Sequence, residues 1–336
     1  MKIAVGMSGG VDSAVSAFLL KQQGNDVIGI TMKLLNNKET NKSIKDAENI
    51  CNKIGIKFYV LDLVKEFKDT VIKDFIDNYK NGYTPNPCVL CNKYFKFGKL
   101  YEYAKSLGYD YIATGHYVDI KDNMLCKCDN NKDQSYFLYQ INKDVIDKIV
   151  FPLREFKSKD EIREIAIKND LIVGNKKDSQ EICFIPDDDY VNFLTDYIKD
   201  KSGNIVLKTG QILGKHNGLY KYTIGQRKGL NISYKSPLYV LDLDIKNNNV
   251  IVGSNEDLFK TKLIADNVNL FENFKEIDCL AKVRSRGNYV NCHAVYENDK
   301  LIVTFTEPVR AITKGQSVVL YRDNTCLGGG IIKEVE

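Results

Sequence analysis

Residues 8–13 read Ser-Gly-Gly-Val-Asp-Ser and directly follow a short apolar run, Ile3–Met7. The two glycines allow a tight turn in which backbone N–H groups point at an anion. Asp12 and Ser13 then begin a helical pattern, so the positive end of a helix dipole faces the same point. The carboxylate of Asp12 could also hold a metal ion bound to phosphates. This segment therefore predicts a site for a phosphate chain.

The segment differs from the common P-loop, because no Gly-Lys-Ser/Thr sequence follows and no adjacent lysine can reach the terminal phosphates. It resembles the PP-loop of ATP pyrophosphatases, which split ATP into AMP and pyrophosphate and adenylate an oxygen of the substrate. The alternative is an ordinary glycine turn. Two flanking serines, an internal aspartate and the strand–helix context favour the phosphate site.

Cysteines form the second chemically active group. In Pro85–Asn92 (Pro-Asn-Pro-Cys-Val-Leu-Cys-Asn) two prolines stiffen a loop around the first thiol. The alternative, half of a zinc site, needs a second pair, and Cys126-x-Cys128 is a poor one because its thiols would point to opposite faces of a strand. Cys183 has polar and aromatic neighbours, so it is either a reactive thiol or a core residue. Packing is expected for Cys51, Cys279, Cys292 and Cys326.

A basic segment lies in the second half of the chain. Gly203–Leu241 spans 39 residues without Asp or Glu, where about five acids would be expected from 44 in 336. Its cations could neutralise phosphates and its tyrosines could stack on bases, although a solvated face of a small β module is the alternative. A second basic cluster follows at Lys282, Arg284 and Arg286. Together they favour a nucleic-acid substrate.

The first half of the chain alternates apolar runs with helical patterns. Predicted strands are 27–32, 58–63 and 111–114, and predicted helices are 43–54, 65–80 and 99–107. This alternation predicts an α/β fold with a doubly wound parallel sheet. Such sheets bind ligands at the carboxyl ends of their strands, where Ser8–Ser13, Met32 and Gly115-His116 would lie. The polar stretch Asn36–Lys42 is expected to be a surface loop.

After residue 198 short β-branched and aromatic runs replace the helical patterns, which predicts β-rich modules with a softer boundary near 261. With 43% hydrophobic residues and no apolar run of bilayer length, the composition is that of a soluble protein without a membrane partner. Nine irregularly spaced cysteines and an N-terminus that begins as a strand favour the cytoplasm. The net charge of +4 identifies no partner.

Several motifs fall in one order, and together they resemble the bacterial tRNA-specific 2-thiouridylase family from residue 1 to about 333. They are the loop at 8–13, residues 84–92, 113–117 and 132–138, Glu181–Phe184, the loop at 222–230 and Cys326–Gly330. The resemblance implies an ATP-pyrophosphatase domain at 1–198, a small central tRNA-contacting domain at 199–261 and a C-terminal β-barrel at 262–336.

The resemblance also implies a reaction, the replacement of the 2-oxygen of the wobble uridine by sulfur in the tRNAs for Lys, Glu and Gln. ATP would activate that oxygen, with Mg²⁺ on the pyrophosphate. The ATP-binding residues would be Gly6, Met7, Ser8, Gly9, Gly10, Val11, Asp12, Ser13, Met32 and Gly115. A persulfide on Cys183 would deliver the sulfur, and Cys91 would release it and leave a Cys91–Cys183 disulfide for cellular thiols to reduce. A cysteine desulfurase or a sulfur-relay protein would load Cys183.

The same resemblance assigns tRNA contacts. The residues bordering the flipped target base would be Asn86, Pro87 and Cys88. The other contacts would be His116, Lys132, Asp133, Gln134, Arg284, Ser285 and Gln316. For His116 a structural role at a strand end is the alternative.

One position departs from the family pattern. Many members have aspartate three residues before the first catalytic cysteine, where this chain has Cys88. A thiol is a poor base but a good soft-metal ligand. Cys88, Cys91 and Cys183 could therefore hold a [4Fe–4S] cluster, which is the alternative to persulfide chemistry. Two rival functions are a small-molecule PP-loop ligase and a non-catalytic RNA-binding protein.

Overall fold

The computed structural model describes residues 1–128, 132–171 and 182–336. It divides into two compact units, each assembled from segments that are distant in sequence. The first unit comprises Met1–Ile72, Cys88–Gln180 and Asp323–Leu327, and the second Lys73–Pro87, Glu181–Arg322 and Gly328–Glu336. The chain therefore passes from the second unit to the first immediately before Cys88.

The first unit is built on a parallel five-stranded sheet in the order β3-β2-β1-β4-β7. Its strands are β1 (Lys2–Gly6), β2 (Asp26–Lys33), β3 (Lys57–Asp62), β4 (Tyr111–Ala113) and β7 (Ile149–Val150). Ile3 pairs with Val27 of β2 and with Tyr111 of β4, so β1 is the central strand. The predicted parallel sheet is confirmed.

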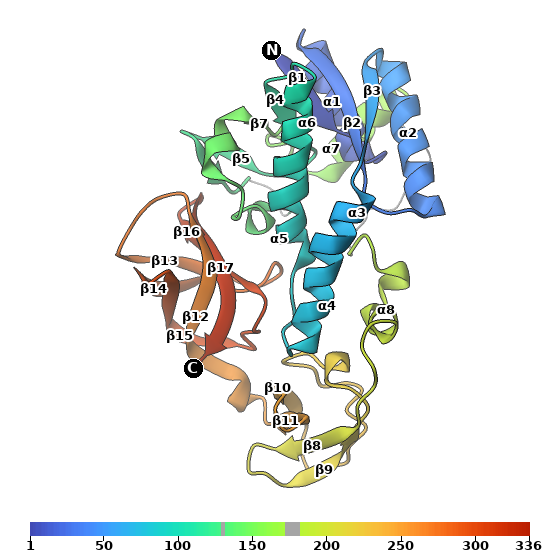
Figure 1. The fold of residues 1–336 in the computed structure, drawn as a ribbon. Coiled ribbons are helices and arrows are strands. Elements are labelled where there is room, and N and C mark those ends of the chain that lie inside the picture. Colours follow the sequence, from blue (N-terminus) through green and yellow to red (C-terminus); the bar gives the residue numbers. More distant parts are fainter. Residues whose placement is uncertain (129–131, 172–181) are drawn as a thin grey trace. The chain divides into compact units, whose positions relative to one another are not determined.

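Helices cover both faces of this sheet (Figure 1). On one face α1 (Val11–Gln22), α2 (Lys38–Ile54) and α7 (Lys159–Lys168) share an apolar core with β1. On the opposite face α6 (Leu100–Ser106) packs against β4. Buried members of the shared core include Ile3, Val5, Val15, Ala47, Ile50 and Ile162.

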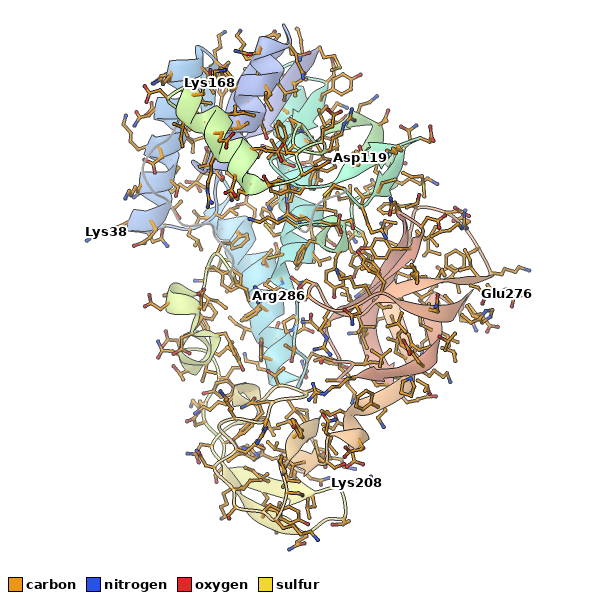
Figure 2. All side chains as sticks on the ribbon, turned by 180° about the vertical axis from the view of Figure 1, so that it is seen from behind. Lys38, Asp119, Lys168, Lys208, Glu276 and Arg286 are labelled. Atoms are coloured by element: carbon orange, nitrogen blue, oxygen red, sulfur yellow. The ribbon has the colours of Figure 1, made fainter. Side chains whose placement is uncertain are left out.

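The predicted surface loop at Asn36–Lys42 is wrong, because α2 already begins at Lys38. The side chain of Asn37 accepts a hydrogen bond from the backbone N–H of Thr40 at 2.8 Å, which caps the helix. Lys38 extends into solvent (Figure 2), so this first turn lacks the apolar periodicity that marks a helix in a sequence. The predicted end at Gly55, which has a φ of +74°, is confirmed.

The helix predicted at 65–80 has three parts, namely α3 (Val64–Phe67), a π-helical turn (Lys68–Ile72) and α4 (Lys73–Lys80). The stiff loop predicted around Cys88 is instead a helix, α5 (Pro87–Cys91), which continues into a π-helical segment (Asn92–Lys99). Pro87 is tolerated there because the first residue of a helix needs no N–H donor.

The second unit contains a small four-stranded sheet in the order β10-β11-β8-β9. Its strands are β8 (Gly203–Leu207), β9 (Ile212–His216), β10 (Tyr239–Asp244) and β11 (Asn249–Gly253). Ile205, Val240 and Val250 are fully buried and form its core. The short helix α8 (Tyr190–Thr195) precedes this sheet in the chain.

Six further strands form a closed barrel, in which pairing of the first strand with the last removes both edges. They are β12 (Phe259–Leu270), β13 (Glu276–Lys282), β14 (Val290–Glu297), β15 (Lys300–Arg310), β16 (Ser317–Arg322) and β17 (Thr325–Val335). In the first unit a hairpin of β5 (Asp119–Lys121) and β6 (Met124–Cys126) pairs with Thr325. The predicted central β-rich module and C-terminal barrel are confirmed.

The remaining regular elements are short 3-10 turns at Ser135–Phe137, Lys143–Lys148, Pro186–Asp188, Leu219–Lys221 and Glu256–Leu258. Across the described ranges, the helices are all too short or too polar to cross a bilayer. The domain boundaries at residues 198 and 261 stay predictions.

Candidate functional site

The glycine loop between β1 and α1 has a shape that only glycine permits at its centre. Gly9 has a φ of +69°, and a Cβ there would lie 2.5 Å from the carbonyl oxygen of Ser43. The hydroxyl of Ser13 donates to the carbonyl of Gly10 at 3.0 Å and accepts from the N–H of Ser8 at 3.2 Å. No described side chain caps the first turn of α1. The N–H groups of that turn are therefore available to an anion.

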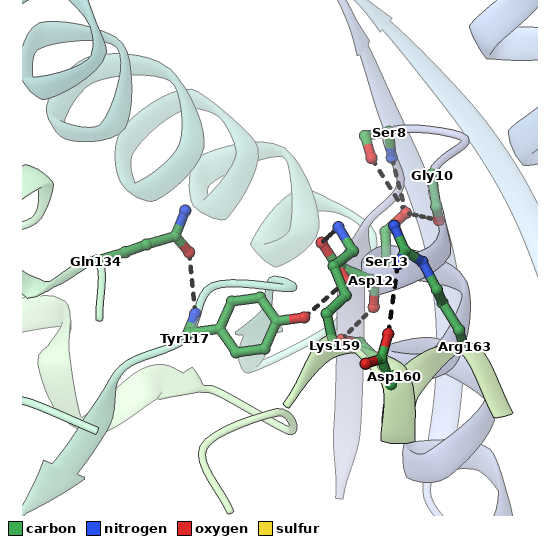
Figure 3. A network of polar contacts seen from close by, with 10 residues as sticks. Ser8, Gly10, Asp12, Ser13, Tyr117, Gln134, Lys159, Asp160 and Arg163 are labelled. Carbon is green, nitrogen blue, oxygen red and sulfur yellow. Dashed lines mark hydrogen bonds and ion pairs between the residues drawn. The ribbon is translucent and has the colours of Figure 1, made fainter. Parts of the chain in front are cut away.

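Asp12, in the first turn of α1, holds two partners from distant parts of the first unit. Its Oδ1 accepts a hydrogen bond from the Tyr117 hydroxyl at 2.9 Å, and its Oδ2 lies 3.1 Å from Lys159 Nζ. Figure 3 shows the carboxylate between the hydroxyl and the ammonium group. A lysine therefore does lie at the loop, although Lys159 is 147 residues from Asp12 in the sequence.

Sequence reasoning missed Lys159, although two signals mark it. Ser158 and Glu161 form a reciprocal capping box, which fixes Lys159 as the first residue of α7. A cation is unfavourable in the first turn of a helix, because the dipole is positive there. The side chain of Lys159 is only 10% exposed, so the fold holds this unfavourable charge close to Asp12.

The residues predicted to lie against adenosine follow the ends of neighbouring strands. Met32 lies near the end of β2, beside β1 in the sheet, and is half-buried. Gly115 follows β4, and a Cβ there would lie 2.9 Å from the Cβ of Asp12. The structure therefore brings Gly115 against the start of α1, as predicted. The contact of Met32 and Gly115 with a nucleotide stays a prediction.

His116 is buried between two polar partners. Its Nδ1 lies 2.8 Å from the hydroxyl of Thr114, and its Nε2 lies 3.3 Å from Lys96 Nζ. Burial lowers the pKa of His116 well below its ordinary value of 6.5, and the Lys96 ammonium lowers it further. The imidazole is therefore neutral, with Nε2 accepting from Lys96. A phosphate near this point would meet the charge of Lys96 rather than of His116.

Cys88 and Cys91 lie on α5, one helical turn apart, so they share one face of that helix. Cys91 is buried and Cys88 is exposed. The protein atoms around the Cys88 thiol nevertheless raise its pKa above the ordinary 9.0, and the Lys96 ammonium partly offsets this rise. The segment after Cys91 is held by Asn92, whose amide donates to the carbonyl of Phe137 at 3.0 Å.

Cys183 belongs to the second unit and is exposed, which favours the reactive-thiol interpretation over the core one. The next residue, Phe184, is buried against Phe75 and Phe193, with ring centroids 5.3 and 5.5 Å apart. This packing anchors the chain beside the thiol. The preceding part of its motif, residues 178–181, lies outside the described residues. The pairing of Cys91 with Cys183 stays a prediction.

Two of the three side chains predicted to contact tRNA at 132–134 accept hydrogen bonds from other groups of the protein. Gln134 accepts a hydrogen bond from the N–H of Tyr117 at 3.0 Å, which positions the ring that reaches Asp12 (Figure 3). Asp133 accepts from the hydroxyl of Ser135 at 2.7 Å. Lys132 is exposed. Only Lys132 therefore presents an exposed side chain here, and the role of all three toward tRNA stays a prediction.

On the barrel, two of the side chains predicted to contact tRNA also make hydrogen bonds within the protein. Arg284 donates to the carbonyls of Arg310 and Ala311, and Gln316 donates to the carbonyl of Thr84 at 2.8 Å. Ser285 is half-buried. Asn86 is half-buried and Pro87 buried, and both lie in the same unit as Gln316. Their contacts with tRNA stay predictions.

The basic segment Gly203–Leu241 is only partly available to a nucleic acid. The prediction that the tyrosines stack on bases is wrong for Tyr220, because this side chain is 3% exposed. Its hydroxyl donates a hydrogen bond to Asp200 at 2.6 Å. Tyr234 is exposed. The exposed cations of the segment are Lys208, which is paired with Asp257, and Lys215, Arg227, Lys228 and Lys235.

A metal site of protein ligands is not preformed in the residues that the structure describes, where no three His, Cys, Asp or Glu side chains gather around one point. Cys88 and Cys91 share a helix, but Cys183 belongs to the other unit. A [4Fe–4S] cluster on these three thiols stays a prediction.

Comparison with known proteins identifies the family over nearly the whole length. Family models match at residues 1–187 (tRNA methyl transferase HUP domain), 191–254 (tRNA methyl transferase PRC-barrel domain) and 260–332 (aminomethyltransferase beta-barrel domain). The chain is 46% identical to tRNA-specific 2-thiouridylase MnmA 1 of Fusobacterium nucleatum, over 99% of this chain and 94% of that protein. It is 45% identical to MnmA of Clostridioides difficile and 47% identical to MnmA 2 of Clostridium tetani, each over 99% of this chain and 98% of the relative.

Proposed function

The chain belongs to the tRNA-specific 2-thiouridylase family, and we propose that it thiolates the wobble uridine of the tRNAs for Lys, Glu and Gln by way of a protein persulfide. It is a sulfurtransferase of an ATP-utilising PP-loop family. The proposal assigns activation of the uridine to the loop before α1 and delivery of sulfur to the cysteines. It keeps the domain division at 1–198, 199–261 and 262–336.

One observation carries the activation step. Asp12 lies at the start of α1 with a lysine against its carboxylate, and the N–H groups beside it have no side-chain cap among the described residues. ATP phosphates would replace these internal contacts on Gly6–Ser13. The Asp12 carboxylate already holds a cation, so it suits Mg²⁺, which when bound would neutralise charge on the pyrophosphate. The uridine 2-oxygen then attacks the α-phosphorus, and pyrophosphate leaves.

The second step uses two thiols with different exposure. The exposed Cys183 can be loaded with a persulfide by a cysteine desulfurase or a relay protein. Its terminal sulfur bonds to C2 of the uridine. The Cys91 thiolate then attacks Cys183 Sγ, the bond to the transferred sulfur breaks, and AMP leaves with the former 2-oxygen. The Cys91–Cys183 disulfide that forms is reduced by cellular thiols. The buried position of Cys91 protects this thiol from other oxidants.

The test is a complete reaction. The protein is incubated with ATP, Mg²⁺, a cysteine desulfurase, L-cysteine and unmodified glutamate tRNA, and 2-thiouridine and AMP are measured. We expect both products in equal amounts from the wild type and no 2-thiouridine from Cys91→Ser or Cys183→Ser. Cys279→Ser, a change at a partly exposed cysteine of β13, is the matched control and should retain activity.

Other results identify the rivals. AMP without sulfur incorporation would favour a small-molecule ligase, and neither product would favour an RNA-binding protein without catalysis. Anaerobic reconstitution with iron and sulfide tests the cluster on Cys88, Cys91 and Cys183. Thiolation that requires the reconstituted iron would overturn the persulfide route.

A further inference from the structure

The loop that leads into α5 is clamped by the barrel through both backbone groups of one residue. The N–H of Thr84 donates to the carbonyl of Lys314 at 2.9 Å. The carbonyl of Thr84 accepts from Nε2 of Gln316 at 2.8 Å. Thr84, Lys314 and Gln316 all belong to the second unit. The clamp therefore joins two segments of one compact body that are 232 residues apart in sequence.

The barrel side of the clamp is itself held firmly. The N–H of Gly315 donates to the carbonyl of Ile332 in β17 at 2.8 Å, and the N–H of Ile332 donates back to the carbonyl of Gln316 at 2.8 Å. Gly315 has a φ of +92°, and a Cβ there would lie 2.9 Å from the Thr84 nitrogen. Glycine thus permits both the turn and the close approach of Thr84.

The clamp lies a short distance along the chain from two thiols. Cys88 is four residues after Thr84 and Cys91 is seven. Pro85 and Pro87 restrict the backbone between Thr84 and α5, because proline fixes its own φ and limits the preceding residue. A fixed Thr84 therefore constrains where α5 begins.

We propose that Gln316 is a positioning residue for thiolation, which holds the start of α5 through the carbonyl of Thr84. One of its two amide N–H groups is used within the protein, so we expect loss of this side chain to reduce the rate of sulfur transfer more than the affinity for tRNA. The inference rests on the proposed role of Cys91 as the thiol that releases the sulfur.

Two variants on the barrel side disturb different backbone groups of Thr84. Gln316→Ala removes the donor to Thr84. Gly315→Ala keeps that donor and removes no group that could contact tRNA, but its methyl group would push against the Thr84 nitrogen. Arg286→Ala, a change at an exposed cation of the barrel (Figure 2), is the control for electrostatic tRNA binding. Thermal unfolding of each variant, compared with that of the wild type, checks whether the barrel remains folded.

The first measurement is steady-state thiolation. For Gln316→Ala and Gly315→Ala we expect kcat to fall about tenfold, with KM for tRNA within twofold of the wild type, because a small displacement of a catalytic group reduces rate more than binding. Arg286→Ala should show the reverse, a raised KM with an unchanged kcat. Gln316→Lys, which can still donate to the Thr84 carbonyl, should recover part of kcat.

The second measurement needs neither tRNA nor turnover. The rate at which iodoacetamide alkylates Cys91 is followed by peptide mass spectrometry, with Cys183 as the internal reference. We expect both clamp variants to alkylate Cys91 several-fold faster than the wild type. If wild-type protein forms no 2-thiouridine, the proposed function fails. If it does, and both clamp variants keep the wild-type kcat and Cys91 alkylation rate, or if Gln316→Ala raises only KM, the inference alone is overturned.

Discussion

Lys159 Nζ lies 3.1 Å from Asp12 Oδ2, and this ion pair joins the first turns of α1 and α7. Both residues are at positive helix ends, where a carboxylate is favourable and an ammonium group is not. Asp12 therefore offsets the unfavourable position of Lys159 in the nucleotide-free protein. A phosphate chain at the same point would offer Lys159 a second anionic partner and relieve the two helix dipoles together.

We expect Lys159→Met to reduce kcat/KM for ATP by about 10- to 100-fold, because a charge-assisted hydrogen bond to phosphate is lost. AMP formation with tRNA present measures the effect. Arg163→Met, four residues later on α7 and also drawn in Figure 3, is the matched control and should stay within twofold. Equal effects of the two changes on kcat/KM would contradict the prediction that Lys159 contacts the phosphates of ATP.

The glycine loop was predictable from the sequence, because the patterns of a strand, a glycine turn and a helix start all lie within residues 3–20. The Lys159–Asp12 pair and the Gln316–Thr84 contact were not predictable, because the partners are 147 and 232 residues apart in sequence and no local pattern pairs them. The local signals around Lys159 indicate the start of a helix but not its partner. The helix α5 was missed for a different reason. Its two nearby prolines are typical of a loop, yet one of them occupies the first helical position, where proline is tolerated.

Gly9 offers a test of the loop geometry. Gly9→Ala should lower the free energy of unfolding by about 2 kcal/mol or more, because the new methyl group meets the Ser43 carbonyl at 2.5 Å and the φ is positive. Gly55→Ala is the matched control, since Gly55 has a φ of +74° but no described atom within 4 Å of its Cβ position. We expect that change to cost about 1 kcal/mol. Urea denaturation of both variants makes the comparison, and equal losses would contradict the predicted clash.

The lowered pKa values of two buried histidines predict that the free energy of unfolding decreases at acid pH. Burial lowers the pKa of His116 and of His216, and the hydrogen bond to the Asn248 carbonyl only partly opposes this for His216. The unfolded chain therefore binds these protons more readily than the folded one. Stability from the neutral imidazoles is complete above the unfolded pKa of about 6.5 and declines as pH falls towards the folded values. Each histidine contributes a slope of at most about 1.4 kcal/mol per pH unit.

The measurement is urea denaturation between about pH 5 and pH 7.5, where few carboxylates titrate. We expect the wild type to lose stability below about pH 6.5. His116→Gln should lower stability at neutral pH but reduce this slope, and His216→Gln should do the same independently. An unchanged slope in both variants would show that other groups cause the acid sensitivity.

Cys88 separates the persulfide route from a cluster. In the persulfide route sulfur passes only between Cys183, the uridine and Cys91, so the Cys88 thiol is not consumed. Cys88→Asp restores the residue that many family members have, and we expect it to keep thiolation within about tenfold under iron-free, chelator-treated conditions. Cys88→Ala is the matched control for the loss of a polar side chain at this position. If Cys88→Asp and Cys88→Ala both lose thiolation, and iron and sulfide restore the wild type alone, the soft thiolate of Cys88 acts as a metal ligand rather than a neighbour of the base.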